Sequence, residues 1–285
     1  MTPTVAAAGE RPARTAARVG VRALRIALLA LVLGTACAPH RVAPPSPGAG
    51  AREAAFRASL SGRETRGRAV DAAVTLWARS QHAGVWPAVT GALTLRAPDA
   101  LRLRVASMFG TAFDGAVRGD SVVAVLPTRG LGLIADAARD PLGLRRPGAL
   151  GFRMFAAAWR PPDSAWASGT WSQDTLALHW LEQGDSLRLD IGPDGLPVAI
   201  TLGRGDSLRV HAEYRAWKRI AGVSWPSWIE LEGGGGALAV RCKVDRLRFV
   251  ERPGPGRPMA QLPAGTTALD WPGFRRALER APGLR

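Results

Sequence analysis

The chain has 285 residues, with 38 Lys and Arg against 23 Asp and Glu, and its formal net charge is +15. A hydrophobic fraction of 47% excludes both a disordered chain and a protein that crosses a membrane many times. Two cysteines, Cys37 and Cys242, exclude a disulfide framework, and the lack of a fixed period excludes a repeat protein.

Residues 1–36 have the composition of an export signal. Five arginines and one acid precede an unbroken apolar run at 26–33, which is too short to cross a membrane, since about 20 residues are needed. Gly34, Thr35 and Ala36 follow the run, and Cys37 comes next. We expect residues 1–36 to be a signal peptide, and residues 37–50, rich in Pro, Ala and Gly, to be a tether.

The end of this signal, LVLGTAC, resembles the lipobox of bacterial lipoproteins, although Gly34 stands where that pattern usually has leucine. The resemblance implies cleavage before Cys37 and a diacylglyceryl group on its sulfur, so that acyl chains such as palmitate anchor the protein to a membrane. The alternative is an ordinary secretory signal followed by an incidental cysteine. Without residues 1–36 the chain keeps 33 basic and 22 acidic residues, a net charge of +11.

The body begins with a short helix within 51–61 and changes at Ala69 to the alternating pattern of strands. Further strands are expected at 89–95, 101–105, 112–117 and 121–126, then helices at 130–138 and 149–159, and a last short helix at 271–280. The tripeptide Gly-Asp-Ser occurs three times, beginning at Gly119, Gly184 and Gly205, and predicts hairpin turns, as does Pro193-Asp194-Gly195. The second half therefore predicts a meander of six strands, and the whole an α+β fold with one large antiparallel sheet.

Catalytic and metal-binding patterns are missing from the sequence. Of the four histidines, His179 and His211 lie in predicted strands and could approach each other, whereas His40 and His82 lie in the tether and in a turn. No HExxH, CxxC, GxSxG or phosphate-binding glycine loop is present, so we expect no enzyme, no metal and no cofactor. Cys242 is expected to be a small core residue or a free thiol. The export signal and the absence of a recognised module also argue against nucleic acid as a partner.

Ten tryptophans against one tyrosine suggest a wide curved sheet around an apolar cavity, with an ordinary core as the alternative. Three segments carry a resemblance to the LolA/LolB superfamily of bacterial lipoprotein carriers and receptors. They are LRAPDALRLRVASMFGTAFDGAVRGDSVVAVLP at 95–127, WSQDTLALHWLEQGDSLRLDIGPDGLPVAITL at 171–202, and the closing WPSWIELEG and LAVRCKVDRLRFV. The resemblance covers about residues 55–265.

The resemblance implies an unclosed antiparallel β-barrel, a single large curved sheet with short helices covering one side. It places a lipid-binding domain at 51–268 and a short C-terminal helix and tail at 269–285. An apolar cavity would take acyl chains, and parity leaves open which strand face lines it. The candidate lining residues are Leu93, Leu95, Leu103, Val105, Val123, Val125, Leu187, Leu189, Val198 and Ile200.

The same resemblance, together with Cys37, implies a LolB-like receptor anchored in the outer membrane and facing the periplasm. Met108, Phe109 and Gly110 match a protruding loop that touches the bilayer in such receptors; the alternative is that Met108 and Phe109 fold into the core. The expected partners are acyl chains of lipids or lipoproteins, the membrane and a soluble LolA-like periplasmic carrier, and the chain is expected to be a monomer.

Three functions follow as hypotheses. The first is an envelope protein that binds acyl chains or lipoproteins in an apolar cavity and acts in lipoprotein localisation. The second is a non-catalytic envelope interaction lipoprotein with a filled core and no ligand traffic. The third, a hydrolase, requires His179 or His211 beside a serine and a carboxylate. A large continuous cavity would favour the first over the second.

Overall fold

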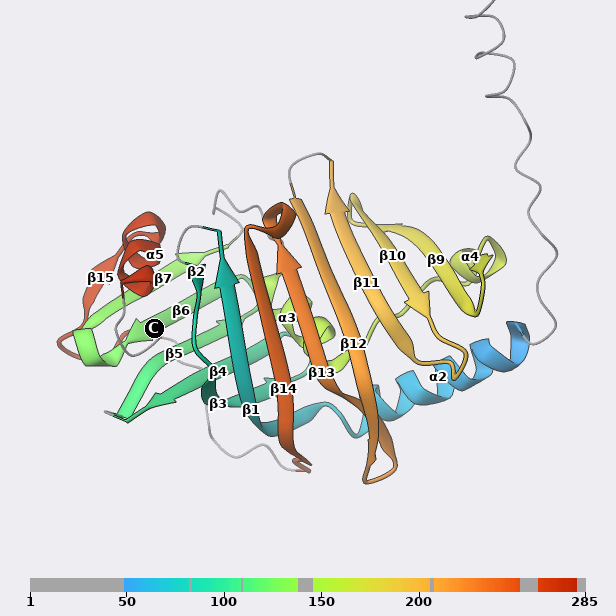
Figure 1. The fold of residues 1–285 in the computed structure, drawn as a ribbon, viewed down its shortest axis with the longest axis horizontal. Coiled ribbons are helices and arrows are strands. Elements are labelled where there is room, and N and C mark those ends of the chain that lie inside the picture. Colours follow the sequence, from blue (N-terminus) through green and yellow to red (C-terminus); the bar gives the residue numbers. More distant parts are fainter. Residues whose placement is uncertain are drawn as a thin grey trace, which may run out of the picture. The chain divides into compact units, whose positions relative to one another are not determined.

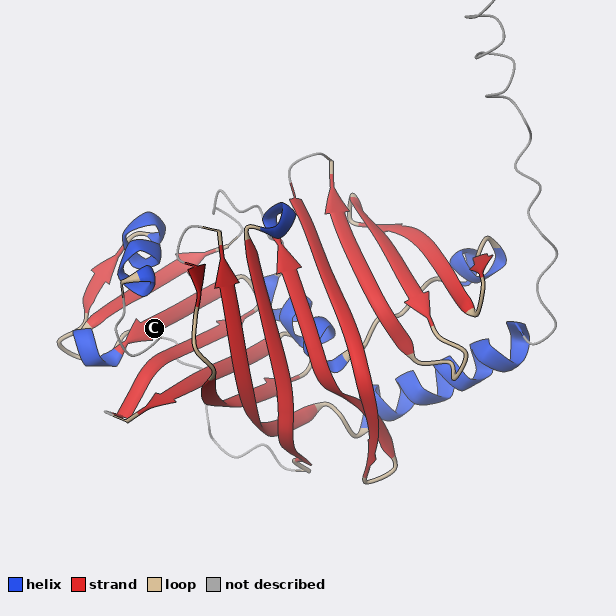
Figure 2. Ribbon diagram, in the orientation of Figure 1, coloured by secondary structure: helices blue, strands red, loops and turns tan. Residues whose placement is uncertain are grey.

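The computed structural model describes residues 49–81, 84–108, 110–137, 146–205, 208–251 and 261–280. The predicted signal peptide, Cys37 and most of the tether lie outside these residues. All of the described elements belong to one unit, Pro44–Arg285. Figure 2 shows that this part of the chain is dominated by strands, with a few helices beside them.

The α-helices are α2 (Ala49–Thr65), α3 (Pro147–Ala156), α4 (Asp163–Ala167) and α5 (Trp271–Glu279). Short 3-10 turns occur at η1 (Pro127–Arg129) and η2 (Gly234–Gly236). The strands of the first half are β1 (Ala69–Ser80), β2 (Gly84–Val85), β3 (Val89–Arg96), β4 (Ala100–Ser107), β5 (Gly110–Arg118), β6 (Ser121–Leu126) and β7 (Leu131–Asp136). Those of the second half are β8 (Thr170–Ser172), β9 (Thr175–Glu182), β10 (Asp185–Ile191), β11 (Pro197–Arg204), β12 (Leu208–Ile220), β13 (Val223–Gly233), β14 (Leu238–Phe249) and β15 (Thr267–Leu269).

These fifteen strands form one sheet in the order β15-β7-β6-β5-β4-β3-β1-β14-β13-β12-β11-β10-β9-β8, with β2 paired to β1 (Figure 1). The two ends of this order, β15 and β8, do not pair with each other, so the sheet is unclosed. Strands β9 to β14 are the predicted six-strand meander. The fold class predicted from the sequence is confirmed, with one addition: β15 pairs with β7 in parallel, which makes the sheet mixed.

One face of the sheet, called the inner face here, holds the core. On β1 the alternating residues Val70, Val74 and Leu76 are buried in one cluster with Phe56 and Leu60 of α2. Residues of α3, which packs mainly against β4 and β5, and of α4, which packs against β9, extend this cluster. At the other end, α5 packs on β6 and β7 in a second cluster. Helices at both ends therefore cover the same face.

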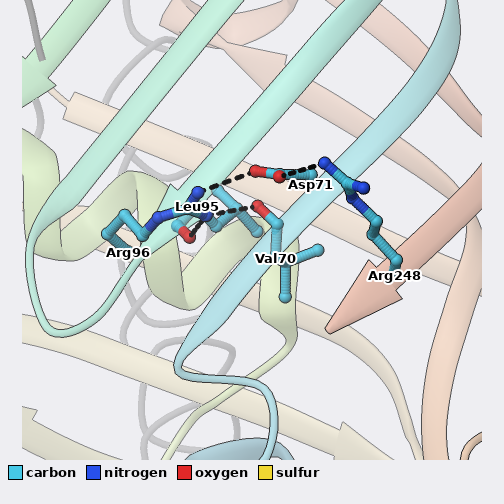
Figure 3. A network of polar contacts seen from close by, with 5 residues as sticks. All are labelled: Val70, Asp71, Leu95, Arg96 and Arg248. Carbon is cyan, nitrogen blue, oxygen red and sulfur yellow. Dashed lines mark hydrogen bonds and ion pairs between the residues drawn. The ribbon is translucent and has the colours of Figure 1, made fainter. Parts of the chain in front are cut away.

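Polar contacts hold β1 between its two neighbours. Arg96 of β3 donates to the carbonyl of Val70 at 2.9 Å and to the carboxylate of Asp71 at 2.8 Å (Figure 3). Arg248 of β14 donates to the other oxygen of Asp71 at 3.2 Å. Burial alone would raise the pKa of Asp71, but the hydrogen bonds from Arg96 and Arg248 outweigh it and hold that pKa below its usual value. The carboxylate of Asp71 thus links the side chains of three adjacent strands, β3, β1 and β14.

The helix predicted at 130–138 is wrong, because this segment forms β7. Leu131 and Leu133 alternate with Gly132 and Ile134, and β7 pairs with β6 on one side and with β15 on the other. The pattern is short and rich in Leu and Ala, which also suits a helix, but the alternating leucines face Phe274 of α5. Tertiary packing decides between two local preferences here.

Other local predictions are confirmed. The helices expected at 51–61, 149–159 and 271–280 correspond to α2, α3 and α5. Gly119 (φ 56°) and Gly184 (φ 86°) adopt the left-handed backbone at the β5–β6 and β9–β10 turns, which explains the glycine there. Gly205 (φ 51°) begins the β11–β12 turn, whose Asp206 and Ser207 lie outside the described residues. No described helix combines the length and the apolar character that crossing a membrane requires.

Candidate functional site

The inner face carries an apolar pocket of about 140 Å³ at one end of β1 and β14. The lining consists of apolar side chains and comprises Leu76, Ala78, Trp86, Pro87, Val89, Leu103, Val105, Phe113, Val240 and Leu278. An apolar cavity of about 150 Å³ can stay dry and bind a benzene-sized molecule. The pocket is therefore large enough for the end of one acyl chain and too small for a whole one.

Strands that are distant in sequence build this pocket through their register. Leu76 of β1 lies opposite Val89 of β3, and Ala78 lies opposite Val240 of β14. Val105 of β4 lies opposite Phe113 of β5, and α5 contributes Leu278. The pocket thus depends on the pairing of β1 with both of its neighbours and on the docking of α5.

Two details shape the pocket wall. The Phe113 ring lies over Gly115, where an added Cβ would come within 2.5 Å of the ring carbon Cζ, so that only glycine leaves room for the ring. The indole Nε1 of Trp86 is buried and has no hydrogen-bond acceptor among the described residues. An unsatisfied buried donor costs about 1–3 kcal/mol. A ligand with a polar group beside its apolar chain could use this donor.

The β4–β5 hairpin reaches beyond the pocket. Met108 at its tip is 89% exposed, which contradicts the alternative that this residue folds into the core. The Ser107 hydroxyl donates to the carbonyl of Gly110 at 3.1 Å and closes the tip, and Gly110 (φ 109°) has a backbone that other residues rarely adopt. Phe109 lies outside the described residues. An exposed Met side chain forgoes about 1.5–3 kcal/mol of burial energy, which it would recover in a lipid or protein partner.

The predicted lining residues fall into three groups. Leu103 and Val105 line the pocket. Inner-face residues that pack in the core instead are Leu93, Leu95, Leu187, Leu189 and Ile200. The remaining three lie elsewhere: Val198 is 37% exposed, and Val123 and Val125 are buried on the face of β6 opposite to inner-face Ala124 and Leu126. These three are corrections to the predicted lining. Parity places the two valines of β6 on the opposite face, whereas Val198 lies at a register irregularity between β10 and β11, where Asp190 pairs with Ala199 and Ile191 with Pro197.

Most of the inner face is filled rather than hollow. Trp159, after α3, and Tyr214 of β12 are fully buried side by side, with the indole Nε1 donating to the phenol oxygen at 3.1 Å. Burial raises the pKa of Tyr214 well above its usual value, so this hydroxyl stays protonated. Trp225 of β13 is also buried and packs edge-on against Phe249. The many tryptophans thus serve largely as core, and a small pocket remains at one end.

His179 and His211 both line a polar groove of about 730 Å³ in the second half of the sheet. They come from β9 and β12, with β10 and β11 between them, so they are not neighbours. The Nδ1 of His211 shares a hydrogen bond of 2.9 Å with the Thr201 hydroxyl, and its Nε2 lies 3.5 Å from Glu213. Neither of these two partners of His211 is a serine.

The remaining candidates concern cysteine and metal chemistry. Cys242 of β14 is fully buried, and burial raises the pKa of its thiol to about 12, so the thiol is protonated at neutral pH. Its position fits the core residue that the sequence predicts. In the part of the chain that the structure describes, no group of three His, Cys, Asp or Glu side chains could hold a metal ion. His40, His82 and Cys37 lie outside that part.

Sequence reasoning missed most of the pocket lining. Leu76 and Ala78 continue the alternation of β1, so they could have been predicted from the sequence. Trp86 and Pro87 lie in the irregular link from β2 to β3, where no such pattern exists. Val240 and Leu278 reach the pocket through long-range pairing, which no local pattern shows. A further residue, Arg63 of α2, was also missed; its spacing of seven from Phe56 and three from Leu60 places it on the buried face of that helix.

The fold and pocket define an open-sheet protein with a small apolar site and an exposed hairpin tip. Among solved structures, a LolA superfamily protein of Nitrosomonas europaea is similar, with a TM-score of 0.48 and 9% identity over 70% of this chain and 94% of that chain. A putative outer membrane lipoprotein-sorting protein domain of Vibrio parahaemolyticus has a TM-score of 0.42 and 8% identity over 70% of this chain and 95% of that chain. A DUF1329 family protein of Desulfovibrio piger has a TM-score of 0.40 and 8% identity over 70% and 94%. No protein-family model and no curated protein matches the chain.

Proposed function

We propose that this chain is a non-catalytic protein of the bacterial envelope that binds the end of an acyl chain in the apolar pocket and acts in lipoprotein localisation. The observation that carries the proposal is the pocket itself: ten apolar side chains line a volume of about 140 Å³. Each methylene group moved from water into such a site contributes about 0.8 kcal/mol. A few methylenes give reversible binding, which suits transfer rather than storage.

The exposed tip supports a role at a membrane. Met108 lies three residues after Val105, which lines the pocket, so one hairpin joins the pocket to a hydrophobic tip. In this proposal Met108, Phe109 and Gly110 contact the bilayer, and Cys37 carries the acyl anchor that keeps the protein at the outer membrane on the periplasmic side. A soluble LolA-like carrier would deliver the cargo. The net charge of +11 without the signal peptide favours anionic headgroups.

The filled part of the inner face favours a second candidate function. Trp159, Tyr214 and Trp225 occupy space that a larger cavity would need. A protein whose core is complete without ligand would serve as a non-catalytic envelope interaction lipoprotein. The two candidate functions differ in whether an acyl chain binds in the apolar pocket.

The test uses a neutral monoacylglycerol that carries a photoactivatable diazirine at the end of its chain. After illumination with the purified full-length protein, mass spectrometry of peptides should place the cross-links at 84–89 and 103–105. Ala78→Phe, which fills the pocket, should reduce the cross-linking about tenfold or more, since it removes the burial of two or more methylenes. Circular dichroism would verify that the variant is folded.

Ala73→Phe is the matched control, because Ala73 lies on the same strand but is exposed on the opposite face. It should leave the cross-links unchanged. Cross-links scattered over the surface, or equally strong in Ala78→Phe, would reject acyl binding at this pocket and leave the interaction protein with a filled core.

A further inference from the structure

Arg63 is a cation inside the protein. It lies in the last turn of α2, where it follows Phe56 and Leu60 on the face that packs against the sheet, and its exposed fraction is 0%. Arginine is almost never fully buried unless it is paired with a carboxylate. A buried charge without such a partner costs several kcal/mol of desolvation, so its presence calls for a reason.

The guanidinium of Arg63 is only partly satisfied. Its Nη1 donates to the Ser59 hydroxyl at 2.6 Å and more weakly to the Ser224 carbonyl at 3.5 Å. Its Nε and Nη2 are buried and have no acceptor among the described residues. The neighbouring carboxylate, Glu64, is held by Arg160 instead. Burial lowers the pKa of Arg63 to about 10, so it remains a cation at neutral pH.

Trp217 of β12 adds a third donor. Its ring centroid lies 5.2 Å from the guanidinium carbon of Arg63, and its indole Nε1 is likewise buried without an acceptor. A local irregularity turns this residue inward: Ala216 has the left-handed φ of 52°, which a residue with a Cβ rarely adopts. Trp217 therefore lies beside Tyr214, three positions earlier, although simple alternation would put them on opposite faces.

Two glycines, Gly62 and Gly67, lie at the end of α2 that carries Arg63. Gly62 faces Val223 at the start of β13, where an added Cβ would be in ordinary van der Waals contact with that side chain at 3.9 Å. At Gly67, just after the helix, a Cβ would come within 2.3 Å of the Arg63 carbonyl oxygen, so no other residue fits. Glycine inside a helix also costs about 1 kcal/mol relative to alanine, which weakens this turn.

We propose that Arg63 and Trp217 form a binding site for a single oxyanion of the phosphate or carboxylate class. The anion accepts hydrogen bonds from Nε and Nη2 of Arg63 and from Nε1 of Trp217, and it reaches them when the last turn of α2 lifts from β13. This site is separate from the acyl pocket: it lies by the first residues of β13, near Ser224, whereas Val240 of the pocket lies opposite Leu231, near the other end of that strand. The two proposals can therefore fail independently.

The first test is the sign of a stability change. Arg63→Met replaces the cation by an apolar side chain of similar length, and removing an unpaired buried charge should raise the midpoint of thermal unfolding by about 2–4 °C. Arg66→Met is the matched control, since Arg66 is exposed at the same end of the helix and donates to the Ala221 carbonyl at 2.9 Å. Its midpoint should stay the same or fall slightly. A fall in the Arg63→Met midpoint would mean that Arg63 is structural and would overturn the proposal.

The second test is the response to anions, measured with the full-length chain at constant ionic strength. Replacing chloride by inorganic phosphate should raise the unfolding midpoint of the wild type and of Arg66→Met, and should leave Arg63→Met unchanged. Trp217→Phe keeps an aromatic ring but removes the Nε1–H donor, so phosphate should raise the unfolding midpoint of this variant less than that of the wild type. A response that survives in Arg63→Met, or none in the wild type, would refute the site.

The same titration distinguishes the two sources of phosphate. Dihexanoyl phosphatidate should act at lower concentration than inorganic phosphate if the natural ligand is a lipid headgroup, whereas equal potency assigns free phosphate to the site. Because the acyl pocket is probed with a neutral lipid, a negative result there leaves these outcomes unaffected.

Discussion

At the scale of single residues, Asp71 shows how charge placement affects stability. Its pKa is held below the usual range in the folded chain by Arg96 and Arg248. A carboxyl whose folded pKa is lowered stabilises the protein above its unfolded pKa and loses that contribution as the pH falls through the folded value. The lowered pKa values of Glu182 beside Arg153 and of Glu213 beside Arg215 act in the same direction.

We therefore expect the free energy of unfolding to decrease below about pH 4, where these carboxyls take up protons. Asp71→Asn should cost at most about 1 kcal/mol at pH 7, because the ion pairs are partly exposed and screened. At pH 2 the variant and the wild type should be nearly equal. Urea denaturation at both pH values measures this, and a difference that is unchanged in acid would contradict the ion-pair explanation.

Residue-level prediction from sequence was uneven for physical reasons. Leu103 and Val105 were placed at the pocket because alternation is visible in one strand. Arg63 was missed because its type suggests solvent, although its helical spacing places it beside Leu60. Arg57 of the same helix is exposed and paired with Asp163. Composition alone does not separate two such arginines; position on the helix does.

At the scale of elements, α5 links the end of the chain to the pocket. Phe274 is buried among Leu126 and Leu133, and Leu278 on the same helix reaches the pocket wall. Asp270 caps the helix, accepting a hydrogen bond from the Gly273 N–H at 2.8 Å. The helix that the sequence predicts as a tail thus packs on the sheet that carries the site.

Phe274→Ala should cost about 3–5 kcal/mol of unfolding free energy, since it empties a buried aromatic site. It should also loosen Leu278 and weaken cross-linking of the acyl probe. Hydrogen exchange of α5, followed with urea denaturation, measures both effects. Arg275→Ala, an exposed neighbour on the same helix, should change neither; if the two variants behaved alike, α5 would not be part of the pocket wall.

Strand β7 shows why element prediction fails where both faces are apolar. In β6, Val123, Ala124, Val125 and Leu126 are all buried, so parity does not stand out, but the valines favour the strand that the sequence predicts at 121–126. The segment around Leu133 has the same ambiguity, and only pairing with β6 and β15 makes it a strand. The second half was predicted better because Gly-Asp-Ser turns mark the strand ends there.

At the scale of the whole molecule, the proposed anchor can be tested directly. Cells that make the wild-type chain should incorporate labelled palmitate into it and retain it in the membrane fraction, whereas Cys37→Ser should lose both. Cys242→Ala is the control, because the buried thiol of Cys242, with its pKa of about 12, is not available for acylation. Palmitate in Cys37→Ser, or none in the wild type, would contradict the lipoprotein proposal.

The unclosed sheet has a consequence for contacts between copies of the chain. An open sheet presents unpaired N–H and C=O groups at its edges, and such edges can template the addition of strands from other molecules. Here the order ends in β8 (Thr170–Ser172) and β15 (Thr267–Leu269), each only three residues long, while the interior strand β12 has thirteen. An incoming strand would gain few hydrogen bonds at β8 or β15 themselves, but β8 pairs only with Thr175–Ala177 of β9 and leaves the rest of β9 without a described strand partner on that side. The short terminal strands therefore limit strand addition at β8 and β15, and the outer edge of β9 beyond Ala177 is where a strand from another molecule is expected to add.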